Sequence, residues 1–232
     1  MIPIRDENPA RTTPYVTIAL LVANVAVFVL QMLQPPEAQQ AIVYAWGAIP
    51  RDITQGFDLL PAIPVAWLTL FSSMFMHGGL MHLGGNMLYL WIFGNNIEDA
   101  LGHVKFLLFY VVGGLIAALS HVVFDPASDI PMVGASGAIS AVLGAYMLAF
   151  PRAKVVVLLF IVFIIRFIRV PALIMLGIWF AMQLFGFAGE AGGQGGGVAW
   201  LAHIGGFVAG VLLAFLAGVR PQRALSRGYT YR

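Results

Sequence analysis

Residues 106–124 read FLLFYVVGGLIAALSHVVF and contain no charged side chain. A transmembrane helix needs about 20 predominantly apolar residues, so this stretch is long enough to cross a bilayer. Similar uncharged windows recur along the chain, at 12–36, 59–97, 130–151, 170–189 and 191–219. Together they predict an all-α, polytopic membrane protein.

The composition excludes several classes of protein. Hydrophobic residues make up 60% of the 232 residues and charged residues only 9%, whereas soluble domains carry about 25% charged residues. The polar surface is therefore too small to cover a water-soluble globule. The net charge of +2 is too small for a nucleic-acid-binding surface, so no nucleic acid is expected as a partner. Because the chain has no cysteine, disulfides and thiolate metal sites are excluded.

The windows predict a bundle of six transmembrane helices. The window 59–97 is longer than one span, and its first part holds Pro61 and Pro64, so its helix is placed in the second part. The apolar segment 155–165 is too short to span and is flanked by basic residues, which predicts an interfacial or re-entrant segment. The expected helices are 15–33, 79–96, 104–122, 134–150, 171–188 and 199–218.

Basic residues are distributed asymmetrically across these helices. Eleven of the 12 Lys and Arg residues fall on one side, and only Arg51 falls on the other. The positive-inside rule therefore predicts that both termini are cytoplasmic. The first helix is interpreted as an anchor, because its apolar run is long for a signal peptide and no A-x-A-like site follows. The predicted parts are a short cytoplasmic N-terminus, a membrane domain and a basic cytoplasmic tail, at 1–14, 15–218 and 219–232.

Four polar residues lie inside the expected spans, where such groups are costly and mark function. His82 and Asn86 belong to the second helix, Ser136 to the first turn of the fourth, and His203 to the sixth. These three helices run in the same direction, and each polar group follows soon after the helix begins. We therefore expect the four side chains at similar depth, in the outer half of the bilayer.

The residue types fit acyl transfer. A serine hydroxyl is a weak nucleophile that needs an adjacent base, and neutral histidine is the usual one. Ser136 and His203 are therefore the candidate catalytic dyad. His82 and Asn86 are four residues apart on one helix face, and both can donate hydrogen bonds to a developing oxyanion. No Asp or Glu is available at this depth to orient His203, so a dyad and a slow enzyme are expected.

Small residues recur on the two helices that carry the dyad. Such residues let membrane helices approach closely, and a Ser–His hydrogen bond between helices requires close approach. The repeats are Ser136, Ser140 and Gly144 in the fourth helix, and Gly206 and Gly210 beside His203 in the sixth.

Each of these features has a simpler explanation when it is taken singly. A lone serine in a membrane helix usually bonds its own backbone, and Asn86 could simply hold two helices together. A small-solute transporter or channel would carry charged residues along a pathway. The expected helices carry such residues only at their ends, so the combination of four polar residues favours catalysis over transport.

Four motifs resemble those of the rhomboid family of intramembrane serine proteases, and the resemblance covers nearly the whole chain. The family has a six-helix core, which agrees with the number of helices expected here. The motifs are HGGLMHLGGNM (77–87), GNNIEDALG (94–102), GASG (134–137) and AHIGGFVAG (202–210).

The resemblance implies an activity and residue roles. Ser136 would be the nucleophile, His203 the general base, and His82 and Asn86 would line the oxyanion hole. The reaction would hydrolyse peptide bonds in or near transmembrane helices of other proteins, in the lipid bilayer, without metal or cofactor. The fifth helix and the glycine-rich loop after it, 189–197, would gate lateral access of the substrate. Separately from the resemblance, the short termini and the charge asymmetry suit a prokaryotic plasma membrane.

The alternative function is that of a non-catalytic relative that binds membrane proteins as a chaperone or adaptor. Such relatives usually lack the dyad, which this chain retains. The natural substrate and the oligomeric state do not follow from these patterns.

Two positions depart from the family pattern. Many members carry Trp-Arg in the first external loop, where this chain has Leu68-Thr69. Some members place Tyr four residues after the nucleophile, stacked on the catalytic histidine, and this chain has Ser140 there. The sequence therefore leaves open how His203 is held in place.

Overall fold

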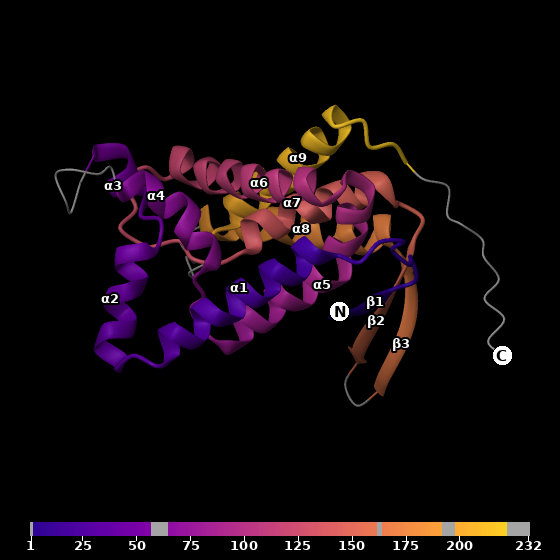
Figure 1. The fold of residues 1–232 in the computed structure, drawn as a ribbon, viewed down its shortest axis with the longest axis horizontal. Coiled ribbons are helices and arrows are strands. Elements are labelled where there is room, and N and C mark those ends of the chain that lie inside the picture. Colours follow the sequence, from indigo (N-terminus) through magenta and orange to yellow (C-terminus); the bar gives the residue numbers. More distant parts are fainter. Residues whose placement is uncertain (1, 57–64, 162–163, 192–197, 222–232) are drawn as a thin grey trace.

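The computed structural model describes residues 2–56, 65–161, 164–191 and 198–221, and Figure 1 shows them as a helical bundle with a small sheet at one end. Most of the glycine-rich loop expected to gate lateral access of the substrate, at 192–197, lies outside the described residues. The same holds for most of the predicted basic tail, from residue 222 onward.

All six helices expected from the uncharged windows are present, which confirms the all-α membrane bundle. Three of them, at 15–32, 103–124 and 172–189, are long and apolar enough to cross a membrane, and those at 136–149 and 200–216 are shorter apolar helices. The six are α1 (Tyr15–Met32), α5 (Leu80–Leu101), α6 (His103–Phe124), α7 (Ser136–Ala149), α8 (Ala172–Ala191) and α9 (Trp200–Leu216).

The connection between α1 and α5 is largely helical within its described residues. It contains α2 (Pro36–Trp46), α3 (Pro50–Gln55), α4 (Val65–Ser72) and a 3-10 turn, η1 (Ser73–Phe75). Proline begins both α2 and α3, where its missing N–H costs no intrahelical hydrogen bond. Helices α2, α3 and α4 lie at the end of the bundle opposite the sheet (Figure 1).

The sheet was not predicted. The described residues of the segment 155–165, expected to be interfacial or re-entrant, belong to an antiparallel hairpin of β2 (Lys154–Ile161) and β3 (Ile164–Pro171). The N-terminal strand β1 (Ile2–Asp6) pairs antiparallel with β2, which gives the order β1-β2-β3. The valines and isoleucines of the hairpin favour extended backbone, and a run this short cannot form a spanning helix.

Helix α7 is the innermost helix of the bundle. Ten of its 14 residues are buried, so it packs against neighbours on almost all sides. A Cβ added at Gly144 would collide with the carbonyl oxygen of Phe207 on α9, and one added at Gly210 would collide with that of Ala141 on α7. The close approach of these two helices, predicted from their small residues, is therefore confirmed.

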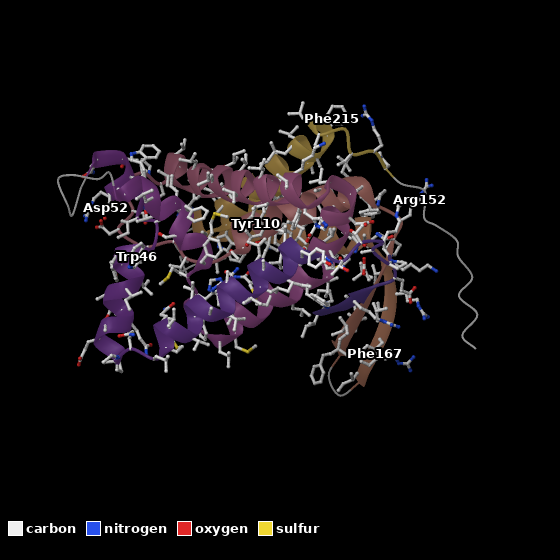
Figure 2. The ribbon with its side chains drawn as sticks, viewed as in Figure 1. Trp46, Asp52, Tyr110, Arg152, Phe167 and Phe215 are labelled. Carbon is white, nitrogen blue, oxygen red and sulfur yellow. The ribbon has the colours of Figure 1, made fainter. Side chains whose placement is uncertain are left out.

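The outer surface is apolar. Trp46, Phe167 and Phe215 point outward and are 54%, 66% and 53% exposed, whereas Tyr110 lies fully buried inside the bundle (Figure 2). Water-soluble proteins rarely expose large apolar side chains in such density. This surface therefore suits a chain surrounded by lipid.

Candidate active site

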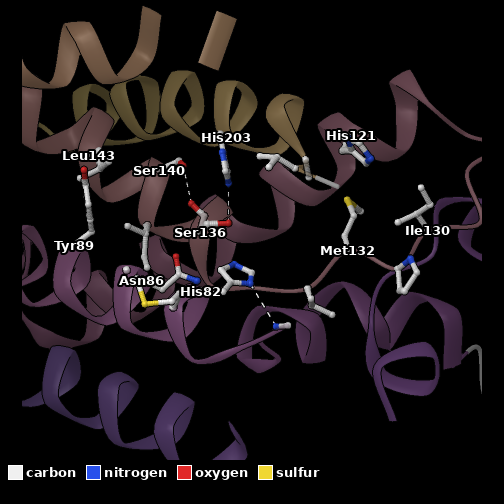
Figure 3. A pocket seen from close by; sticks show the side chains of 18 of the residues that line it. His82, Asn86, Tyr89, His121, Ile130, Met132, Ser136, Ser140, Leu143 and His203 are labelled. Atoms are coloured by element: carbon white, nitrogen blue, oxygen red, sulfur yellow. Dashed lines mark hydrogen bonds between the residues drawn. The ribbon is translucent and has the colours of Figure 1, made fainter. Parts of the chain in front are cut away.

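A pocket of about 570 Å³ lies among α5, α6, α7, α8 and α9 and the loop that precedes α7. Its lining includes all four residues singled out in the sequence: His82, Asn86, Ser136 and His203 (Figure 3). The structure thus brings together side chains from three helices. Their expected similar depth is consistent with this shared pocket.

Ser136 and His203 form a direct hydrogen bond. Ser136 is the first residue of α7, and His203 lies in the first turn of α9. The distance from His203 Nε2 to Ser136 Oγ is 2.8 Å. Because the first N–H groups of a helix have no intrahelical partner, α7 also offers backbone donors and the positive end of its dipole beside Ser136.

Ser140 lies one turn after Ser136 on α7. Its hydroxyl donates to the carbonyl oxygen of Ser136 at 2.6 Å. The Ser140 side chain is thereby committed to the backbone of its own helix, as is common for serine in membrane helices. The support of His203 must therefore come from other residues.

His82 and Asn86 lie across the pocket from His203, with Ser136 between them (Figure 3). The Gly78 N–H donates to His82 Nδ1 at 3.4 Å, so Nε2 carries the proton of the neutral ring. Asn86 Nδ2 is buried and has no hydrogen-bond partner within the described residues. Two N–H donors are therefore available on this side of the pocket.

The backbone at Gly134 lies against both donors. A Cβ added there would lie 2.7 Å from His82 Nε2 and 3.5 Å from Asn86 Nδ2. Gly134 also has a φ of +125°, which residues other than glycine rarely adopt. Glycine is therefore required two residues before Ser136, because it lets the loop pass close to the donors.

Two residues near His203 were missed from the sequence. Gln183 Oε1 lies 2.8 Å from His203 Nδ1, and the ring of Trp179 lies 6.0 Å from the imidazole, measured between centroids. Both belong to α8. The signal that could have found Gln183 is the one used for the other four residues, a strongly polar side chain inside an uncharged span.

His77, which precedes α5, supports the donor side of the pocket. It is fully buried, and its ring packs edge-on against His82 with 5.1 Å between centroids. Its carbonyl oxygen accepts a hydrogen bond from Gln31 Nε2 of α1 at 3.1 Å.

Within the part of the chain that the structure describes, His, Asp and Glu side chains form no group of three suited to a metal ion.

Comparison with known proteins assigns the family. Residues 64–220 match the profile of the Rhomboid domain, and the matched segment contains the pocket and both residues of the Ser136–His203 pair. The chain therefore belongs to the rhomboid family of integral membrane proteins.

Several curated relatives match most of the chain. It is 31% identical over 227 residues to Rhomboid protease GluP of Bacillus subtilis (strain 168), a match that covers 97% of this chain and 41% of that protein. It is 30% identical over 216 residues to the mitochondrial Rhomboid protein 1 of Saccharomyces cerevisiae, covering 90% of this chain and 55% of the relative. A shorter match, 35% identical over 114 residues, covers 48% of this chain and 30% of the mitochondrial Presenilin-associated rhomboid-like protein A of Danio rerio. The chain thus spans about half or less of the length of these relatives.

Proposed function

We propose that this chain is an intramembrane serine endopeptidase that cleaves peptide bonds in or near transmembrane helices of other membrane proteins. The observation that supports this most strongly is the 2.8 Å contact between His203 Nε2 and Ser136 Oγ, made between two helices inside a pocket. A nucleophile and a base at this distance are the parts that acyl transfer requires.

In the proposed mechanism, His203 Nε2 takes the proton of the Ser136 hydroxyl as Oγ attacks the carbonyl carbon of the scissile peptide bond. The resulting oxyanion accepts hydrogen bonds from His82, Asn86 and the backbone N–H of Ser136. His203 then gives the proton to the leaving amine, and the C–N bond breaks. Water, deprotonated by the same Nε2, hydrolyses the acyl-enzyme and restores Ser136.

The setting of the reaction is part of the proposal. A substrate helix has no free backbone carbonyl to offer until it unwinds locally, so segments with helix-weakening residues should be preferred.

The charge asymmetry supports a prokaryotic plasma membrane with both termini in the cytoplasm. The relative named as a protease, from Bacillus subtilis, supports a catalytic rather than a chaperone-like role.

A fluorophosphonate probe tests this function on the detergent-solubilised chain, because the probe phosphonylates an activated serine. We expect labelling of the parent and none of Ser136→Ala or His203→Ala. Ser72→Ala is the matched control, since Ser72 lies outside the pocket and donates only to the Trp46 carbonyl, at 2.8 Å. An unlabelled parent, or labelling that persists in Ser136→Ala, would contradict the proposal and favour a non-catalytic role.

A further inference from the structure

Gln183 is a polar side chain on the face of α8 that meets α9. It is only 6% exposed. A buried amide in an apolar setting is costly unless its donors and its acceptor find partners. Both the NH₂ group and the oxygen of the Gln183 amide have partners. Nε2 donates to the Trp179 carbonyl oxygen at 3.0 Å, and Oε1 lies 2.8 Å from His203 Nδ1.

These two contacts determine which way the amide points. A carbonyl oxygen can only accept, so the NH₂ group of Gln183 must face Trp179. The amide oxygen must then face His203, and an oxygen acceptor needs a donor opposite it. His203 Nδ1 therefore carries the proton of the neutral imidazole.

The tautomer of His203 has a direct chemical consequence. With the proton on Nδ1, the lone pair of Nε2 is directed at Ser136 Oγ, 2.8 Å away. The other tautomer would place an N–H there, and such a ring could not accept the serine proton. In triad proteases a carboxylate makes this choice, and a wrong tautomer lowers turnover by about 10⁴.

The contact also persists through the reaction. Once Nε2 has taken the serine proton, Nδ1 still donates to Gln183 Oε1, now from a charged ring. A hydrogen bond from a charged donor is stronger than one from a neutral donor, so the amide stabilises the imidazolium more than the resting imidazole. The ring of Trp179 also packs beside the His203 imidazole, with 6.0 Å between the ring centroids.

We propose that Gln183 is the positioning residue that holds His203 in the Nδ1–H tautomer, in the place that a carboxylate occupies in a triad. This inference rests on the proposed function, because the tautomer affects rate only if His203 is a base. It also accounts for how His203 is held although Ser140 stands where some family members have a tyrosine.

The first test separates acceptor chemistry from packing. Gln183→Met keeps the length and approximate volume of the side chain but removes the strong acceptor, and Gln183→Glu keeps an oxygen acceptor in either protonation state. The control is Met182→Leu, on the 61% exposed neighbouring residue. Each variant is treated with a fluorophosphonate at several concentrations, which separates the limiting rate of inactivation from the apparent affinity for the probe.

For Gln183→Met we expect the limiting rate to fall about 10²-fold with the affinity for the probe unchanged. This is less than the loss for a triad carboxylate, because a neutral amide stabilises the imidazolium less. Gln183→Glu should remain within about tenfold of the parent, since the acceptor is kept. A limiting rate in Gln183→Met equal to that of Met182→Leu would overturn the proposal, as would equal losses in Gln183→Met and Gln183→Glu.

The second test does not depend on activity. ¹⁵N NMR of histidine-labelled protein distinguishes protonated from unprotonated ring nitrogens, and the His203 signals are assigned by their loss in His203→Ala. We expect a protonated Nδ1 and an unprotonated Nε2 in the parent, and a shift toward protonated Nε2 in Gln183→Met. A parent with protonated Nε2 would overturn the proposal even if Gln183→Met failed to fold.

The two proposals fail differently. If the parent did not react with the fluorophosphonate but showed the expected Nδ1–H tautomer, the proposed function would be wrong and the positioning of His203 by Gln183 would stand. If the parent reacted with the fluorophosphonate but carried the His203 proton on Nε2, the proposed function would stand and the positioning of His203 by Gln183 would be wrong.

Discussion

The Thr17 hydroxyl donates to Glu98 Oε2 at 2.7 Å, although 81 residues separate the two positions. Glu98 lies near the end of α5 and is fully buried, and its carboxylate also accepts the backbone N–H groups of Val16 and Thr17 at 2.9 and 2.8 Å. These are among the N–H groups at the start of α1 that have no intrahelical partner. One side chain thus caps α1 and joins it to α5.

We expect Glu98→Gln to lower the free energy of unfolding by about 1–3 kcal/mol. The amide has the same size but presents an N–H₂ group toward backbone donors, which leaves at least one buried N–H without an acceptor. The measurement is chemical or thermal unfolding in detergent. Glu37→Gln, the same change on an exposed residue of α2, is the control, and an equal effect of the two substitutions would contradict the capping role.

Gly144→Ala should separate the helices that carry the dyad. Its new Cβ would collide with the backbone carbonyl of Phe207, which cannot rotate away as a flexible side chain can. We expect a loss of about 1–3 kcal/mol in stability from overpacking, together with a fall in fluorophosphonate labelling. Gly177→Ala on α8, where a Cβ meets nothing within 4 Å, serves as the control; labelling of Gly144→Ala at the parental rate would refute the expectation.

Removing one donor on the far side of the pocket should slow the reaction without abolishing it. For Asn86→Asp, whose carboxylate has a similar size but no N–H donor, we expect the rate of phosphonylation to fall by about 10²–10³. His82→Ala should show a fall of the same order. Asn95→Asp, on the same helix but outside the pocket lining, is the control, and a parental rate in Asn86→Asp would exclude Asn86 from the oxyanion hole.

Asp6 should make the stability of the chain depend on pH. Tyr146 Oη and Asn96 Nδ2 donate to Asp6 Oδ2 at 2.6 and 2.9 Å, yet burial raises the pKa of the Asp6 carboxyl from 3.8 to about 6. A raised pKa means that the folded chain binds this proton more tightly than the unfolded chain. The contribution of Asp6 is therefore fully present below about pH 4 and is lost as the pH rises through about 6.

The measurement compares unfolding of the parent and Asp6→Asn between about pH 4 and 7. Asp6→Asn removes the titrating group, so the difference in stability between the two proteins should change across this range, with the parent losing stability relative to the variant as the pH rises. About 3 kcal/mol is the upper limit for a shift of this size. A pH-independent difference would show that Asp6 does not titrate between these values.

The membrane helices could be predicted because the information is local. A bilayer requires long uncharged windows, and each can be found without reference to any other part of the chain. The same reasoning identified Ser136, His203, His82 and Asn86, since polar groups stand out inside such windows. The hairpin of β2 and β3 could not be predicted in this way. A short apolar run can form either a strand or an interfacial segment, and its length does not distinguish the two.

Hydrophobic length and charge act on each segment separately, so the linear pattern alone was enough to locate the apolar helices and the polar residues that they carry. Which of those polar residues meet depends on how the helices pack in the folded chain. The rotation of α8 that turns Gln183 toward His203, the closeness of α7 and α9 at Gly144, and the pairing of the N-terminal strand β1 with the distant β2 all depend on packing between segments far apart in the chain. The hydrophobic pattern of one segment does not specify which other segment it packs against. These contacts are therefore known only from the folded structure.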